Sequence, residues 1–346
     1  MLDTVRSLRT FVTASLLAVA FHIDCPIPAA AETTNIERSV PYFTLRNRLE
    51  DDDKFFGNNR GTLSAGRCIM DRTSLEFLSS VAEIAPFRIP EEILDLETIE
   101  EMPSDKLLEN LQAEAAGNPL VYIHGYYIDF EKGCRRATVF KENAGQEDQF
   151  LWFSWPSDGS FLNYARDEVN MYWSVPDLAE IIADLHNRFG SGNVNLAGHS
   201  LGGRGLALAL YEIAGTQPEL RFGEIVLLAP DIDFEVFVKL LPRIRPLARS
   251  LTIYTSANDA ALFVSAELHG YARLGRDGND TSLLKNVEVI DTSDLPIRSA
   301  NGHLYHIYNK EVGDDLGQLL NEGKLAAERG NLLKVNDNQW KLQPVK

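Results

Sequence analysis

Short apolar segments rich in β-branched and aromatic residues alternate with longer segments of helical character along most of this 346-residue chain. This alternation is typical of a parallel sheet, because each crossover helix returns the chain to the same end of the sheet. Leu120–Ile123 and Phe150–Ser154 are expected strands, and Phe130–Asn143 can form the helix between them. We therefore predict an α/β protein with a mainly parallel central sheet and helices on both faces.

The second half of the chain continues the pattern. Apolar residues recur at one-face helical spacing from Asp177, between Pro176 and Gly190, which predicts a helix that covers the sheet. An apolar helix is also expected at residues 206–213, and strands are expected at residues 194–197, 224–229, 250–255 and 286–290. Polar residues follow the last three strands, at the edge where open α/β sheets place their ligands.

The first 31 residues do not resemble part of a folded domain. Arg6 and Arg9 precede an apolar run at residues 11–23, and small residues follow at 28–31, which is the layout of a secretory signal. We therefore expect a signal peptide at residues 1–31 and an exported protein, periplasmic or secreted. No other segment approaches the roughly 20 apolar residues of a spanning helix, so we expect no stable membrane insertion.

Three further parts are expected after the signal. Residues 32–117 form an N-terminal extension packed on the core, with strands at 40–44 and 73–84 and a helix at 104–116. Residues 118–310 form the catalytic core, and residues 311–346 form a C-terminal surface helix with a frayed tail. The first part is expected to extend the sheet.

The charge balance limits the partners. The chain has 50 acidic and 33 basic residues, a net charge of −17, and removal of the signal segment leaves that balance unchanged. Repulsion disfavours nucleic acid and anionic membrane surfaces, so we expect a small-molecule substrate. Cys68 and Cys134 form neither a disulfide framework nor a metal-binding pattern, and whether they pair is left open. We expect no metal or organic cofactor, and the oligomeric state is not indicated.

One strand–helix junction has the residues of a nucleophile. Gly198, Ser200 and Gly202 fit the pattern Gly-x-Ser-x-Gly, whose glycines permit a sharp turn that lifts the serine hydroxyl out of the sheet. The strand at 194–197 and the helix after the glycines supply the context that the motif requires. We predict that Ser200 is catalytic; the alternative is a structural turn serine.

A serine hydroxyl needs a histidine to take its proton and a carboxylate to orient that histidine. In this arrangement the chain order is serine, acid, histidine. His303, in a flexible turn after the last expected strand, is the predicted base, with His306 and His269 as alternatives. Asp259 is the predicted acid and Asp231 the alternative, although either aspartate can instead cap a helix.

The oxyanion of a tetrahedral intermediate needs backbone N–H donors, which contribute roughly 3 to 4 kcal/mol each. Leu201, directly after the serine, is one predicted donor. Tyr126 is the other, because His124-Gly125-Tyr126 resembles the His-Gly element of esterases and Gly125 allows close approach. His124 is expected to pack locally.

Several stretches together resemble an exported bacterial α/β-hydrolase family of esterase- or lipase-like proteins without an assigned function. They read "VYIHGYYIDFEKGCRRA", "FSWPSDGS", "NLAGHSLGGRGL", "LAPDIDFEVF", "LTIYTSANDAAL" and "GHLYH". With "RNRLEDDDKFFGNNRGTLSAGRCIM" upstream, the resemblance covers most of residues 40–308. It implies the α/β-hydrolase fold and a triad of Ser200, Asp259 and His303, but no particular substrate.

These features lead to a hypothesis of carboxylic ester hydrolysis through a Ser200 acyl-enzyme. Thioester or amide hydrolysis would use the same residues. We expect short or medium acyl groups, because no segment is long enough for a large lid over a bulky lipid site. The rival hypothesis is a non-catalytic binding or envelope-interaction protein that keeps the α/β-hydrolase fold, since a fold alone does not establish activity.

Overall fold

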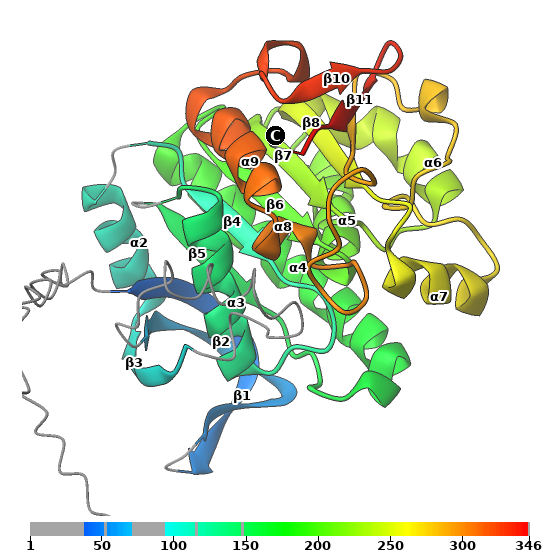
Figure 1. The fold of residues 1–346 in the computed structure, drawn as a ribbon. Coiled ribbons are helices and arrows are strands. Elements are labelled where there is room, and N and C mark those ends of the chain that lie inside the picture. The colour runs from blue at the N-terminus through cyan, green and yellow to red at the C-terminus, as the bar shows by residue number, and fades with distance from the viewer. Residues whose placement is uncertain (1–37, 52–53, 71–93, 115–116, 147–148, 345–346) are drawn as a thin grey trace, which may run out of the picture. The chain divides into compact units, whose positions relative to one another are not determined.

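A mixed sheet runs through the part of the chain that the structure, a computed structural model, describes (Figure 1). The described residues are 38–51, 54–70, 94–114, 117–146 and 149–344. Within them the sheet has 11 strands in the order β10-β11-β9-β8-β7-β6-β4-β5-β1-β2-β3. The expected signal peptide and the strand expected at residues 73–84 lie outside the described residues.

The strands from β11 to β1 in this order are parallel to their neighbours, while β2, β3 and β10 add antiparallel pairs at the two edges. The strands are β1 (Ser39–Asp51), β2 (Lys54–Met70), β3 (Leu96–Met102), β4 (Leu120–Ile123), β5 (Phe150–Ser154), β6 (Asn195–His199), β7 (Phe222–Leu228), β8 (Ala248–Thr255), β9 (Glu288–Asp291), β10 (Leu332–Lys334) and β11 (Gln339–Leu342). The predicted α/β fold with a mainly parallel sheet is therefore confirmed.

Helices cover both faces of the sheet (Figure 1). One face packs against α2 (Ser104–Ala113), α4 (Tyr164–Phe189), α5 (Leu201–Thr216) and α6 (Phe234–Ile244). The other packs against α3 (Phe130–Asn143), α8 (Tyr305–Tyr308) and α9 (Lys310–Glu322), while α7 (Ala260–His269) follows β8. Each face of the sheet has its own hydrophobic core. Because strand side chains alternate between faces, the fully buried β4 contributes to both: Val121 and Ile123 to one core, Leu120 and Tyr122 to the other.

The helix expected to begin after Pro176 begins at Tyr164 instead, so Pro176 lies inside α4. A proline within a helix leaves unbonded the carbonyl four residues earlier. Here that residue is Tyr172, which is exposed. The helix nevertheless continues through this position to Phe189.

The expected frayed C-terminal tail is also a wrong prediction. β11 pairs in parallel with β9, and β10 pairs antiparallel with β11, so the tail completes one edge of the sheet. α9 buries an apolar stripe that includes Val312 and Leu316. Arg329, whose side chain is fully buried, holds this region through ion pairs to Asp315 at 2.7 Å and Glu288 at 2.9 Å. These contacts join segments far apart in sequence.

The N-terminal strands extend the sheet through β1, which runs parallel to β5. A disulfide between Cys68 in β2 and Cys134 in α3 crosses from these strands to a helix of the core, with the two Cα atoms 6.1 Å apart. The pairing that the sequence left open is therefore made in this structure.

Loss of this disulfide is expected to destabilise the protein. The Cys68→Ser/Cys134→Ser double variant should lower the free energy of unfolding by about 4 kcal/mol, because the bridge closes a loop of 66 residues in the unfolded chain. Urea unfolding of the wild-type and double-variant proteins measures this difference. Equal unfolding free energies would contradict a stabilising bridge.

Candidate active site

Ser200 lies at the sharp turn between β6 and α5. Its φ is 54° and its ψ is −121°, a left-handed conformation that is rare for a residue with a side chain. Its backbone is held on both sides: its N–H donates to the Leu228 carbonyl at 2.9 Å, and its carbonyl accepts from the Asp231 N–H at 3.1 Å. Strain of this kind persists where surrounding contacts over-determine it, and it is common at active sites.

The glycines of the motif are required by close backbone contacts. A Cβ on Gly202 would lie 2.2 Å from the His124 carbonyl oxygen, and one on Gly198 would lie 2.7 Å from the Gly203 Cα. Both distances are below ordinary van der Waals contact, so a side chain at either position would displace the elbow. The turn therefore brings α5 directly against the carboxyl end of β4.

Asp259 and His303 are in contact. The His303 Nδ1 lies 2.6 Å from the Asp259 Oδ2, and both residues are buried. Asp259 also caps α7, since its Oδ1 accepts from the Leu262 N–H at 2.9 Å. The Asp259 carboxylate is therefore both a helix cap and a partner of His303, whereas from the sequence these were alternative roles.

The loops that carry these two residues are joined by their backbones. The Ala260 N–H donates to the Asn301 carbonyl at 2.9 Å, and a Cβ on Gly302 would lie 2.3 Å from the Asn258 carbonyl oxygen. Gly302 adopts a φ of +67°. Because the parallel strands β6, β8 and β9 precede these segments, Ser200, Asp259 and His303 all follow carboxyl ends on the same edge of the sheet.

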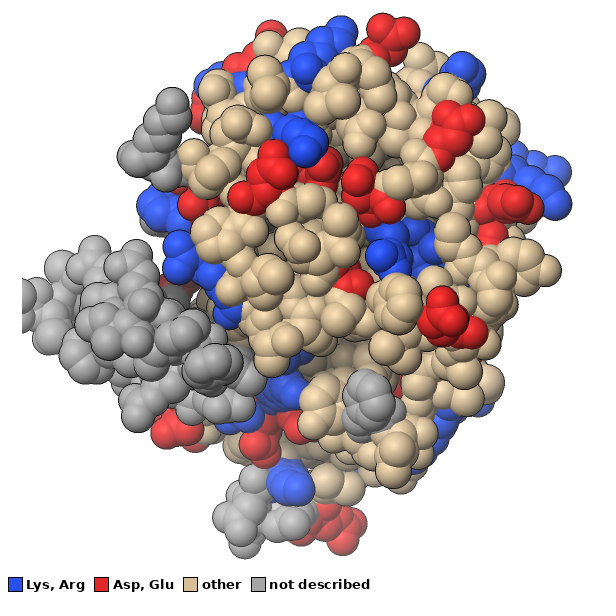
Figure 2. Space-filling view, turned by 45° about the vertical axis from the view of Figure 1, so that its right-hand side comes forward, with Lys and Arg blue, Asp and Glu red and all other residues tan. Residues whose placement is uncertain are grey.

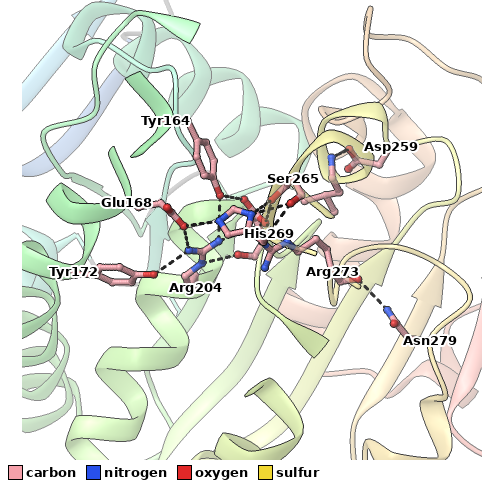
Figure 3. Close-up of polar contacts among 11 residues, drawn as sticks. Tyr164, Glu168, Tyr172, Arg204, Asp259, Ser265, His269, Arg273 and Asn279 are labelled. Carbon is pink, nitrogen blue, oxygen red and sulfur yellow. Dashed lines mark hydrogen bonds and ion pairs between the residues drawn. The ribbon is translucent and has the colours of Figure 1, made fainter. Parts of the chain in front are cut away.

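Asp231, the alternative acid, is buried in a network of charged and hydroxyl groups. Figure 3 labels its partners Tyr164, Arg204, Ser265 and Arg273. It accepts hydrogen bonds from Ser265 Oγ at 2.7 Å and from the Tyr164 hydroxyl, and it forms ion pairs with Arg204 at 3.5 Å and Arg273 at 3.3 Å. Burial opposes its charge, but Arg204 and these hydrogen bonds hold the pKa of Asp231 below its ordinary value. All of these partners differ from His303, which contacts Asp259 instead.

The same network accounts for His269, one alternative base. Its Nε2 lies 3.0 Å from Glu168, and its Nδ1 lies 2.8 Å from the Ser265 carbonyl. Glu168 in turn pairs with Arg204, so α4, α5 and α7 meet at this point (Figure 3). His306, the other alternative, is fully buried beside Tyr122, with 3.3 Å between the hydroxyl and its Nε2. Both histidines therefore have partners of their own.

The loop after β4 lies against Ser200. A Cβ on Gly125 would lie 3.0 Å from the Ser200 Cβ, which brings the predicted oxyanion donor Tyr126 to the neighbourhood of the serine. Leu201 is the first residue of α5, and the first N–H groups of a helix have no partner within it. His124 packs as expected: its ring stacks on Trp155 with 5.0 Å between centroids.

Two charged residues that the sequence does not indicate contact the loops near Ser200. Arg46 of β1 is buried, and its guanidinium donates to the carbonyls of Ile128 at 2.6 Å and Ser157 at 2.8 Å. Asp167 of α4 accepts from the Asp158 N–H at 2.8 Å and from the Tyr127 N–H at 3.4 Å. Together they hold the loops that follow β4 and β5. Nothing in the local sequence distinguishes them from solvated charges.

Three further properties of the described residues concern metal binding, membrane spanning and cavities. They contain no group of three or more histidine, cysteine or acidic side chains placed to hold a metal ion. None of the helices in this part of the chain is long and apolar enough to cross a membrane. A cavity of about 780 Å³, lined by Arg249, Ser250 and Glu288 among others, lies at the amino ends of β8 and β9, away from the edge that carries Ser200.

Comparison with solved structures finds α/β hydrolases and esterases. A candidate cell surface hydrolase of Lactobacillus plantarum WCFS1 is 15% identical, with 61% of this chain and 94% of that chain covered and a TM-score of 0.40. EstE1, a thermophilic carboxylesterase from a metagenomic library, is 12% identical. The match covers 76% of this chain and 85% of that chain, with a TM-score of 0.39. The carboxylesterase CesB of Bacillus subtilis is 13% identical. The match covers 61% of this chain and 85% of that chain, with a TM-score of 0.30.

A comparison with curated proteins finds no match. A family profile gives the assignment: that of the α/β hydrolases of unknown function, DUF900, matches residues 100–321, which is more than half of the chain and includes the strands β4 to β9. The chain therefore belongs to the DUF900 family of α/β hydrolases.

Proposed function

We propose that this protein is a serine hydrolase that cleaves carboxylic esters through an acyl-enzyme. The observation that carries the proposal is the buried 2.6 Å contact between His303 Nδ1 and Asp259, on the sheet edge where Ser200 occupies a strained elbow. Serine, acid and histidine follow one another in the chain order expected for this fold. A base oriented by a carboxylate is what a serine hydroxyl needs to become nucleophilic.

In the proposed reaction His303 Nε2 takes the proton from Ser200 Oγ as that oxygen bonds to the ester carbonyl carbon. The N–H groups of Leu201 and Tyr126 stabilise the negative charge that develops on the carbonyl oxygen. His303 then returns the proton to the leaving alcohol as the C–O bond breaks. Water, activated by the same histidine, attacks the acyl-enzyme and releases the acid and free Ser200.

The net charge of −17 disfavours anionic substrates, which supports a small neutral one. Figure 2 shows acidic and basic side chains interspersed among uncharged ones on the face that it views. Helix α7, which Asp259 caps, exposes the apolar side chains of Phe263, Val264 and Leu268. We propose short or medium acyl groups. A series of p-nitrophenyl esters whose hydrolysis peaked only at long acyl chains would contradict this preference.

We also propose that the protein acts outside the cytoplasm. The signal-like segment at residues 1–31 and the Cys68–Cys134 disulfide support this, because disulfides persist mainly in oxidising compartments. Fractionation of cells that express the full chain tests it. Full-length protein confined to the cytosol with reduced cysteines would refute export.

Fluorophosphonate labelling tests the proposed nucleophile. The probe should lose fluoride as its phosphorus bonds to Ser200 Oγ, and peptide mapping should find the adduct on that residue. Ser200→Ala and His303→Ala should each abolish labelling, because the first removes the attacking oxygen and the second the base. Ser174→Ala, which changes a buried serine within α4, is the matched control and should label normally.

Two outcomes would count against the proposal. Failure of the well-folded wild-type protein to label or to hydrolyse esters would favour the non-catalytic binding protein. An adduct on another serine, unaffected by Ser200→Ala, would place the reactive group elsewhere in the chain.

A further inference from the structure

His199 occupies the variable position before the nucleophile and is almost completely buried, at 4% exposure. Its Nε2 lies 3.2 Å from the backbone carbonyl oxygen of His303. A carbonyl can only accept, so this contact requires the proton on Nε2 and leaves Nδ1 with its lone pair. The residue next to the nucleophile therefore donates a hydrogen bond to the loop that carries the proposed base.

The imidazole of His199 also contacts the other parts of the site. Its ring centroid lies 4.6 Å from that of His303 and 4.1 Å from that of His306. A Cβ on Gly125 would lie 2.8 Å from the His199 Nδ1, so this ring also rests against the loop after β4, here called the oxyanion loop, which carries the predicted donor Tyr126. One side chain thus touches the base loop and the oxyanion loop, and its backbone continues into Ser200.

The environment keeps this ring neutral. Burial lowers the pKa of His199 well below its ordinary value, and the neighbouring His306 and His303 lower it further, against a small opposing effect of the His303 carbonyl. Burial likewise lowers the pKa of His306. A neutral His199 can sit beside His303 without repelling the positive charge that His303 gains during the proposed reaction.

We propose that His199 is a positioning residue that holds the His303 loop in register with Ser200 and the oxyanion loop. The inference rests on the proposed function, in which His303 is the base. The Nε2–H bond sets the position of the His303 backbone, and the Asp259 contact sets the orientation of its ring. Misplacement of a reacting group by about 1 Å can cost about 100-fold in rate, so a single hydrogen bond here has a measurable effect.

The test compares His199→Phe with His199→Gln. Phenylalanine keeps an aromatic ring but removes the donor, and should lower kcat for p-nitrophenyl butyrate by about 10- to 100-fold while KM changes less than about threefold. Glutamine keeps an N–H donor of similar reach and should recover most of the loss. His186→Phe is the matched control and should keep wild-type kcat. It alters a histidine beside Phe222, which lies at the amino end of β7, whereas Ser200 follows the carboxyl end of β6.

Thermal unfolding of each variant shows whether it is folded, and His199→Met supplies a second donor-free variant if the phenylalanine variant does not fold. A folded donor-free variant with wild-type kcat would overturn the positioning role while leaving the proposed function intact. Equal losses in the glutamine and donor-free variants would also overturn it, because ring volume would then be the cause. A wild-type protein that neither labels nor hydrolyses esters would overturn both proposals.

Discussion

Replacement of Asp259 by asparagine is expected to lower kcat/KM for ester substrates by about 10⁴-fold. The carboxylate accepts from His303 Nδ1 at 2.6 Å, which keeps Nε2 free to take the serine proton and stabilises the imidazolium that forms. An asparagine amide removes the charge and can present N–H groups to Nδ1, which favours the wrong tautomer. Steady-state hydrolysis of a p-nitrophenyl ester measures the loss.

The fold should survive this change. Asp259 also caps α7 by accepting from the Leu262 N–H, and asparagine is about as good an N-cap as aspartate. The thermal midpoint of Asp259→Asn should therefore stay close to that of the wild type. An inactive variant with an unchanged midpoint separates a catalytic defect from unfolding.

Asp231→Asn is the matched comparison: it should lose stability and keep most of its activity, whereas Asp259→Asn should lose activity and keep its stability. It leaves Arg204 and Arg273 buried beside a neutral partner, and breaking a buried ion pair in this way costs about 3 to 5 kcal/mol. Activity per folded molecule should fall far less than in Asp259→Asn. If instead a folded Asp231→Asn lost all activity and Asp259→Asn kept it, Asp231 would be the catalytic acid.

The free energy of unfolding is expected to fall steeply as the pH drops below about 6.5. Burial lowers the pKa values of His124, His199 and His306 well below the ordinary value for histidine. Between their folded and unfolded pKa values the unfolded chain binds more protons, so stability is lost as the pH falls. Each such histidine contributes up to about 1.4 kcal/mol per pH unit, or about 4 kcal/mol per unit for the three.

Buried carboxyls oppose part of this effect. Burial raises the pKa values of Asp167 and Asp315, so the folded protein takes up their protons at higher pH than the unfolded chain does. Their contribution favours the folded state at low pH and is lost as the pH rises through the folded pKa values. The net slope should therefore be shallower than the histidines alone would give, wherever in the acidic range these carboxyls take up their protons.

Urea unfolding at about pH 7.5, 6.5 and 5.5 measures the slope, with the wild type compared with His306→Phe. Removal of one buried histidine should lower the loss between the two acidic points by up to about 1.4 kcal/mol per pH unit. An equal loss of stability between these two points in the wild type and in His306→Phe would show that His306 titrates alike in the folded and unfolded states.

Local sequence was enough to predict the features that depend on near neighbours. The strand and helix assignments around Ser200 follow from apolar periodicity and from glycines that a sharp turn requires. The triad was predicted from residue types and chain order, and the structure places Asp259 against His303. The strand, helix and turn predictions succeed because each of these elements is selected largely by residues within a few positions of one another, while the catalytic roles of the three triad residues stay predictions.

The tertiary structure alone decided the features that join distant segments. Only the folded structure places Asp259 against His303 and Asp231 between Arg204 and Arg273. The Cys68–Cys134 bridge, the pairing of β11 with β9 and the contact of His199 with the His303 carbonyl likewise join segments more than 45 residues apart. Such contacts are decided by the packing of the whole sheet, so no local pattern along the chain encodes them.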